Sequence, residues 1–176
     1  MKAESDEHLM RQVATGNLDA LPVLFERHHK HVYNFLYKMS HDQMLSEDLT
    51  QDVFYKVIKY RKTYNDGKFI SWLFTIARNS LSSHYTRKKE NYISLDSAAY
   101  KLAADEEQDK SEEFSQLDIA LQKLDETDRE LLILNRLQEI KYKELAEITG
   151  STPGAVKTKV SRALKKLRAI YFEKVQ

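Results

Sequence analysis

Five polar side chains near the C-terminus have the types and the spacing needed to contact DNA bases. They fall within GSTPGAVKTKVSRALKKLR, residues 150–168. At about 100° per residue, a helix over this stretch places these five on its outer side. Lys and Arg donate hydrogen bonds to guanine in the major groove, while the hydroxyls of Ser and Thr can either donate or accept a hydrogen bond. The candidate base-contacting residues are Lys157, Thr158, Ser161, Arg162 and Lys165.

Two short helices must position this face, and local signals for both are present. Gly150 stands where the first helix, YKELAEITG, needs a left-handed residue to end. Thr152 can cap the second helix, and Pro153 suits its first position. A small residue, a turn glycine and a β-branched residue, at Ala146, Gly150 and Val156, match the pattern of a helix-turn-helix.

The alternative is a solvated charged face on an amphipathic helix, which is the usual meaning of such charge. The turn spacing and the basic bias together favour DNA contact. Lys166 and Arg168 lie further along and suit phosphates rather than bases. The inward stripe of the same helix is Val156, Val160, Ala163, Leu164 and Leu167.

The composition indicates a soluble, helical protein. The chain has 176 residues, enough for one domain or two small ones, with 41% hydrophobic and 31% charged residues. Only 4 Gly and 2 Pro are present, so helix breakers are scarce. The absence of Cys excludes disulfides and thiolate metal sites and fits a reducing compartment. Neither a signal segment nor an apolar run of membrane-spanning length occurs, so we expect a cytoplasmic protein without membrane insertion.

Charge divides the chain into three parts. Residues 1–92 hold 14 basic and 11 acidic side chains, residues 93–128 hold 3 and 11, and residues 129–176 hold 11 and 5. Two basic blocks therefore flank an acidic middle, and residues 93–112 lack a sustained apolar face. We predict an all-α fold of two small helical domains, 1–92 and 113–176. An acidic linker, 93–112, joins them and is expected to be mobile, and the C-terminal domain contains the helix-turn-helix.

Apolar periodicity and capping residues locate the other helices. Ser5 is expected to cap the first helix, a second spans about 18–40, Ser46 caps a third over 46–60, and a fourth covers 69–89. TDRE at Thr127–Glu130 has the pattern of a capping box. The expected inward positions include Phe25, Leu36, Val53, Leu73, Leu117 and Leu121.

Enzymes and other regulators are the competing classes. HHKH at His28–His31 suggests a metal site, but no acidic or Cys partner completes a set, and a solvated, partly aromatic helix face explains it better. No phosphate-binding loop or nucleophile motif occurs. We predict no enzyme activity, no metal and no cofactor. A response regulator would need alternating βαβ units, which are absent. A one-component repressor would leave the N-terminal motifs unexplained.

Those N-terminal motifs are SEDLTQDVFYKV at 46–57 and WLFTIARN at 72–79. With the acidic linker and the final helix-turn-helix, they resemble the extracytoplasmic-function sigma factors of bacteria over almost the whole chain. The resemblance implies a region 2 (1–92) and a region 4 (113–176), no catalysis, binding to RNA polymerase core, promoter recognition and help in opening the −10 element. An anti-sigma factor is a further expected partner. The alternative is a helix-turn-helix regulator that does not bind core polymerase.

The resemblance also assigns residues. The polymerase contact falls on Asp48, Gln51 and Asp52, although Asp48 could merely complement the helix N-terminus. The outer face of the C-terminal helix would read the −35 element. For Trp72, both a core role and a stacking role remain open. The −10 contacts would come from Tyr64, Asn65, Asp66, Lys68, Trp72, Arg78, Asn79, Arg87 and Lys88.

Three positions depart from the family pattern. Ser83 stands where many members have Asp, and Thr75 where some carry a basic residue. Lys141 occupies the usual hydroxyl cap of the first helix in the helix-turn-helix. These departures bear on promoter preference or local stability rather than on class.

Overall fold

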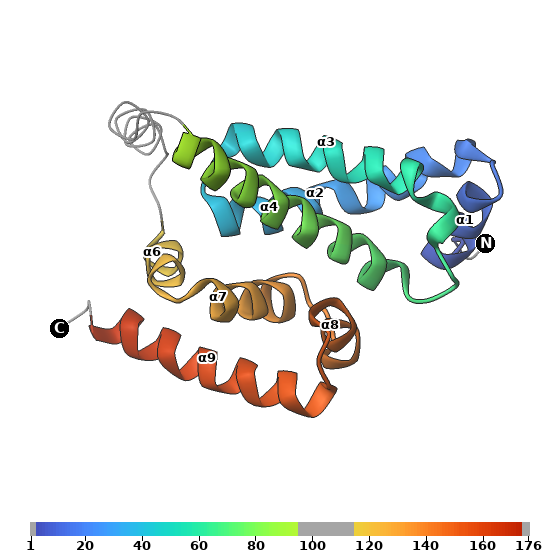
Figure 1. Ribbon diagram of the computed structural model, residues 1–176. Coiled ribbons are helices and arrows are strands. Elements are labelled where there is room, and N and C mark those ends of the chain that lie inside the picture. Colours follow the sequence, from blue (N-terminus) through green and yellow to red (C-terminus); the bar gives the residue numbers. More distant parts are fainter. Residues whose placement is uncertain (1–2, 95–114, 174–176) are drawn as a thin grey trace.

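The computed structural model describes residues 3–94 and 115–173, and these ranges contain helices and no strand (Figure 1). This confirms the predicted all-α fold of two helical domains. The predicted mobile linker lies, from residue 95 onward, outside the described residues. None of the described helices has the length and apolar character required to cross a bilayer. In chain order the elements are α1 (Asp6–Ala14), η1 (Leu18–Ala20), α2 (Leu21–Ser40), α3 (Gln43–Lys59), η2 (Arg61–Thr63), α4 (Phe69–Ser94), α6 (Gln116–Lys123), α7 (Glu126–Leu132), η3 (Ile133–Leu137), α8 (Tyr142–Thr149) and α9 (Pro153–Glu173).

The N-terminal domain is a bundle in which α3 packs against α2 and α4, and α1 closes one end. Its core is aromatic and aliphatic, and the edge of Phe35 meets the face of Phe74 at 5.7 Å between ring centroids. The predicted stripe holds for Leu36, Val53 and Leu73, which are buried. Phe25 is the exception at 39% exposed, because it lies at the margin between α2 and α3, where it packs edge-on against Phe54.

The C-terminal domain packs α6, α7 and α8 against α9. Leu121 is buried as predicted, whereas Leu117 is 38% exposed at the outer side of the short α6. The segment η3 is a turn of π-helix that the apolar run LLIL did not reveal. After it, the backbone of Glu139 takes a φ of 57°, in the left-handed region that a side chain disfavours.

Two predicted helix starts are wrong. Helix α3 begins at Gln43, where the Asp42 carboxylate accepts the Leu45 N–H at 3.0 Å, and Ser46 lies buried one turn inside. The predicted Thr127–Glu130 capping box is likewise replaced by an earlier cap: Asp125 accepts the Asp128 N–H at 2.8 Å. In both cases an upstream carboxylate satisfies the free amides first, so the helix gains extra residues.

One guanidinium organises the corner between the domains. Arg129 donates to the carbonyls of Leu121 at 3.1 Å, Gln122 at 3.3 Å and Leu124 at 3.0 Å, all near the end of α6. The same side chain donates to the carbonyl of Met39 at 3.3 Å, near the end of α2. These hydrogen bonds satisfy carbonyls near helix ends, where backbone partners are fewer.

Candidate nucleic-acid interface

The helix-turn-helix forms as its local signals predict. Gly150 ends α8 with a φ of 66°, a left-handed conformation that glycine adopts at low cost. The Thr152 hydroxyl accepts the Ala155 N–H at 3.2 Å and so caps α9, with Pro153 as its first residue. Val156 is fully buried at the junction. Lys141 makes no side-chain cap to α8, so this departure from the family pattern leaves that helix start uncapped.

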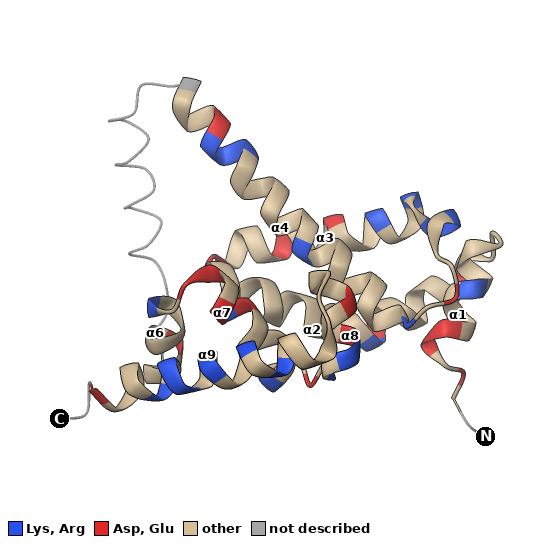
Figure 2. Cartoon of the chain, turned by 60° about the horizontal axis from the view of Figure 1, so that its bottom comes forward, with Lys and Arg blue, Asp and Glu red and all other residues tan. Residues whose placement is uncertain are grey.

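The outer face of α9 is open to solvent along its length. Lys157, Thr158, Ser161, Arg162 and Lys165 are all exposed, as predicted. In Figure 2 the Lys and Arg positions, in blue, recur along this helix. Among the five, Thr158 donates its hydroxyl to the Gly154 carbonyl at 3.1 Å, which holds its side chain against the helix. The arrangement presents cationic and hydroxyl donors on one ridge, suited to a groove.

Lys166, on the same helix, pairs with another residue of the C-terminal domain. Its ammonium lies 2.9 Å from the Asp128 carboxylate of α7, and this hydrogen bond raises the pKa of Lys166. The sequence suggested that Lys166 meets phosphates, whereas the structure engages it within its own domain. Arg168 is exposed.

The turn before α4 is built around an aromatic cluster. Tyr64 is buried, donates its hydroxyl to the Gly67 carbonyl and packs edge-on against Trp72 at 5.4 Å. Burial raises the pKa of Tyr64 to about 12. Trp72 is half-buried against the same core, which favours the core role for it. Tyr64 and Trp72 thus shape the turn.

The other residues of this turn face outward. Asn65, Asp66 and Lys68 are exposed. Asp66 has a φ of 61° and lies 3.7 Å from Arg11, and Lys68 lies 3.8 Å from Glu7. Such exposed pairs are weak and leave these groups available to a partner.

Farther along α4, Arg78 is engaged by the C-terminal domain. Its Nε lies 2.6 Å from the Glu130 carboxylate of α7, and its Nη1 reaches the Ile148 carbonyl of α8 at 3.5 Å. Burial raises the pKa of Glu130, and Arg78 opposes that rise. A cavity of about 260 Å³ adjoins the pair, and Asn79, which is exposed, also lines it. Beyond them Arg87 is exposed and Lys88 half-buried on the same helix.

The outward face of α3 holds the predicted polymerase contacts. Asp48 and Gln51 are exposed one turn apart. Asp52 is half-buried and pairs with Lys56 at 2.9 Å. Lys56 in turn donates to Ser80 of α4 at 2.9 Å. Asp52 thus lies at the edge of this face, and its partner Lys56 ties α3 to α4.

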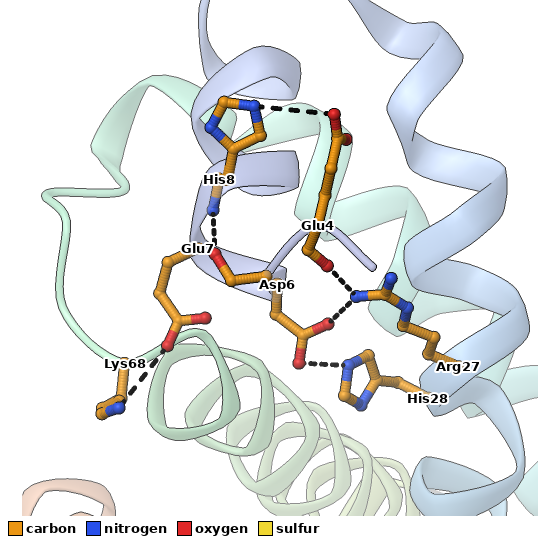
Figure 3. A network of polar contacts seen from close by, with 8 residues as sticks. Glu4, Asp6, Glu7, His8, Arg27, His28 and Lys68 are labelled. Carbon is orange, nitrogen blue, oxygen red and sulfur yellow. Dashed lines mark hydrogen bonds and ion pairs between the residues drawn. The ribbon is translucent and has the colours of Figure 1, made fainter. Parts of the chain in front are cut away.

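His28 of the HHKH motif takes part in a network of polar contacts that joins α1 and α2. Asp6 of α1 accepts from His28 at 2.9 Å and from Arg27 at 3.0 Å, and Arg27 also donates to the Glu4 carbonyl at 2.8 Å (Figure 3). The hydrogen bond from His28 is the main cause that lowers the pKa of Asp6. Among the described residues no group of three or more potential ligands could hold a metal ion. The network instead docks α1 on α2.

The sequence does not indicate which residues contact each other across the two domains. Besides Arg78, Lys38 of α2 lies 2.6 Å from Asp118 of α6, and His31 Nδ1 lies 3.2 Å from the Gln138 side chain. These partners are more than 50 residues apart in the chain, and a single sequence carries no signal that pairs them.

Known families match both halves of the chain. A family model for sigma-70 region 2 matches residues 24–91, and one for sigma-70, region 4, matches residues 114–167. RNA polymerase sigma factor CarQ of Myxococcus xanthus is 35% identical over 168 residues, covering 93% of this chain and 96% of that protein. The extracytoplasmic-function sigma factor SigM of Bacillus subtilis (strain 168) is 27% identical, covering 84% of this chain and 93% of its own length.

Solved structures share the fold. CnrH, in its complex with the cytosolic domain of CnrY, superposes with a TM-score of 0.72 at 24% identity, covering 95% of this chain and 97% of CnrH. RpoE of Bartonella quintana, in complex with the anti-sigma factor NepR, gives a TM-score of 0.70 at 24% identity, covering 85% and 94%. At this identity the likeness concerns the helical architecture.

Proposed function

The chain belongs to the extracytoplasmic-function sigma factors of bacteria, and we infer from this that it binds RNA polymerase core, directs it to specific promoters and assists opening of the −10 element. Residues 1–92 would act as region 2, residues 93–112 as linker and residues 113–176 as region 4. The chain itself would carry out no reaction, since strand opening needs binding energy rather than covalent chemistry. Its place of action would be the cytoplasm, with the polymerase.

Each surface takes one part of this function. The outer face of α9, from Lys157 to Lys165, would read the −35 element in the major groove. Asp48 and Gln51 on α3 would contact the polymerase core, with Asp52 at the margin. On α4 and its turn, Asn65, Asp66, Lys68, Asn79, Arg87 and Lys88 would contact the −10 element, together with Arg78 when it is released. Tyr64 and Trp72 would hold the turn in shape beneath them.

The observation that carries the proposal is the presence of two separate exposed polar faces, one on α3 and one on α9, in a single chain that matches both sigma regions. A helix-turn-helix regulator needs only the second face. An anti-sigma factor would be a natural partner, because the structural neighbours CnrH and RpoE are each recorded with a bound partner protein.

Transcription in vitro tests the proposal. Purified protein and core polymerase are mixed with a promoter library, and transcripts are sequenced. A sigma factor yields transcripts that start downstream of a shared −10 and −35 pair and that disappear without the protein. A regulator that does not bind core would bind duplex DNA but yield no new start site.

A further inference from the structure

Helix α1 lies beside the turn that precedes α4. It contacts η2 and α4 as well as α2, and its apolar side chains Leu9, Met10 and Val13 are buried. The hydrogen bonds that Asp6 accepts from α2 hold the start of this helix in place. The helix precedes residues 24–91, the segment that matches sigma-70 region 2. Packing thus fixes, next to the turn, a helix to which the proposed function assigns no contact.

Two ion pairs join α1 to this turn. The guanidinium of Arg11 lies 3.7 Å from the carboxylate of Asp66. The ammonium of Lys68 lies 3.8 Å from the carboxylate of Glu7, as Figure 3 shows. Asp66 and Lys68 are among the residues proposed to contact the −10 element. Arg11 therefore lies at the edge of the same surface, although it comes from a different helix.

Three of these four charged groups are open to solvent. The side chains of Arg11, Asp66 and Lys68 are 53%, 69% and 62% exposed, whereas that of Glu7 is 27% exposed. A DNA strand that lies along the turn therefore meets two cations and one carboxylate first. Because exposed ion pairs are weak, a phosphate can take the place of the Asp66 carboxylate beside Arg11.

Arg11 and Asp66 together have the chemistry needed to bind one nucleotide. A guanidinium donates two parallel hydrogen bonds to a phosphate, and its planar shape fits that group. A carboxylate accepts a hydrogen bond from the exocyclic amine of cytosine or adenine, and this amine is free once the strand is unpaired. Since packing already fixes α1, Arg11 can bind with little ordering of the backbone.

We propose that α1 forms a second side of the −10 site, where Arg11 contacts a phosphate of the unpaired strand next to the base that Asp66 contacts. This inference rests on the proposed function of the turn. It adds a DNA contact from a helix outside the segment that matches region 2, and this contact supplies affinity without reading a base.

Binding of preformed holoenzyme to a forked duplex tests the contact. The −10 segment of the fork is single-stranded, and affinity is measured across a salt series. Arg11→Gln should lower affinity about tenfold for every −10 sequence and reduce the salt slope by about 0.7. Arg11→Lys, which keeps the charge, should retain the slope. Lys30→Gln, the same charge change at an exposed position of α2, should alter neither quantity.

A double-mutant cycle separates a phosphate contact from mere support of the turn. If Arg11 only holds Asp66 in place, Arg11→Gln should have no further effect in an Asp66→Ala background. A phosphate contact predicts that the loss of affinity and the smaller salt slope persist in that background. The proposal is overturned if Arg11→Gln binds like the wild type, or if its effect disappears together with Asp66.

Transcription by the wild-type holoenzyme distinguishes this inference from the proposed function. If the wild type initiates at promoters and Arg11→Gln leaves fork binding unchanged, the α1 contact is wrong and the function stands. If the wild type with core polymerase yields no transcript from any promoter, the function itself is wrong, and the α1 contact, which rests on it, is wrong as well.

Discussion

Arg162→Ala provides the sharpest test of base recognition. Arg162 is exposed on α9, and no hydrogen bond or ion pair to another described side chain would be lost on its removal, so domain stability should be unchanged. A guanidinium that grips guanine through two donors contributes about 1–3 kcal/mol of discrimination, which is about 5- to 150-fold in affinity. The loss should concern one base pair of the −35 element.

The assay measures binding of the holoenzyme to a panel of duplexes that each alter one −35 position, across a salt series. Arg162→Ala should lower affinity for the preferred sequence and leave the poorest ones nearly unchanged. Arg168→Ala serves as the matched control, since a phosphate contact should weaken all sequences alike and reduce the salt slope by about 0.9. An equal loss on every duplex for Arg162→Ala would show that it anchors the backbone and reads no base.

Three further outcomes are expected. Asp48→Ala combined with Gln51→Ala should weaken core binding in a pull-down titration while circular dichroism shows unchanged helicity; full core affinity would reject the α3 assignment. Lys141→Ser should raise the free energy of unfolding by about 1 kcal/mol in urea denaturation, because it supplies the cap that α8 lacks; Lys141→Ala, which has no capping oxygen, is its control. Asp6→Asn should cost about 1–3 kcal/mol at neutral pH. Because the folded state lowers the pKa of Asp6 from 3.8, the wild type should keep this stability above that pH and lose it as the pH falls further, whereas Asp6→Asn should show a smaller acid loss. A parallel acid profile in the variant would argue against this role.

Local chemistry explains where sequence analysis succeeded. Gly150, Thr152 and Pro153 each determine the backbone at their own position, so the turn before α9 was predictable residue by residue. The exposed ridge from Lys157 to Lys165 followed from helical geometry alone. Both depend on neighbours within about one or two turns.

Competition between capping residues and long-range packing explain what the sequence did not indicate. Ser46 and Thr127 are acceptable capping residues. Asp42 and Asp125 lie slightly upstream, however, and cap the two helices in their place. The types of Tyr64 and Arg78 suit nucleic acid, yet burial of one and the distant partner of the other depend on how the chain folds back. Residue type and spacing do not contain that information.

The hydrogen bonds of Arg129 determine how the domains can part. Three of its four acceptor carbonyls, at Leu121, Gln122 and Leu124, belong to its own domain, and only Met39 lies across the interface. Separation therefore breaks one of these bonds and leaves the corner between α6 and α7 intact. The C-terminal domain should leave as a rigid body, without local unfolding. We thus expect opening on the microsecond-to-millisecond scale of domain motions, and amide hydrogens in α6 and α7 that remain protected from exchange while it happens.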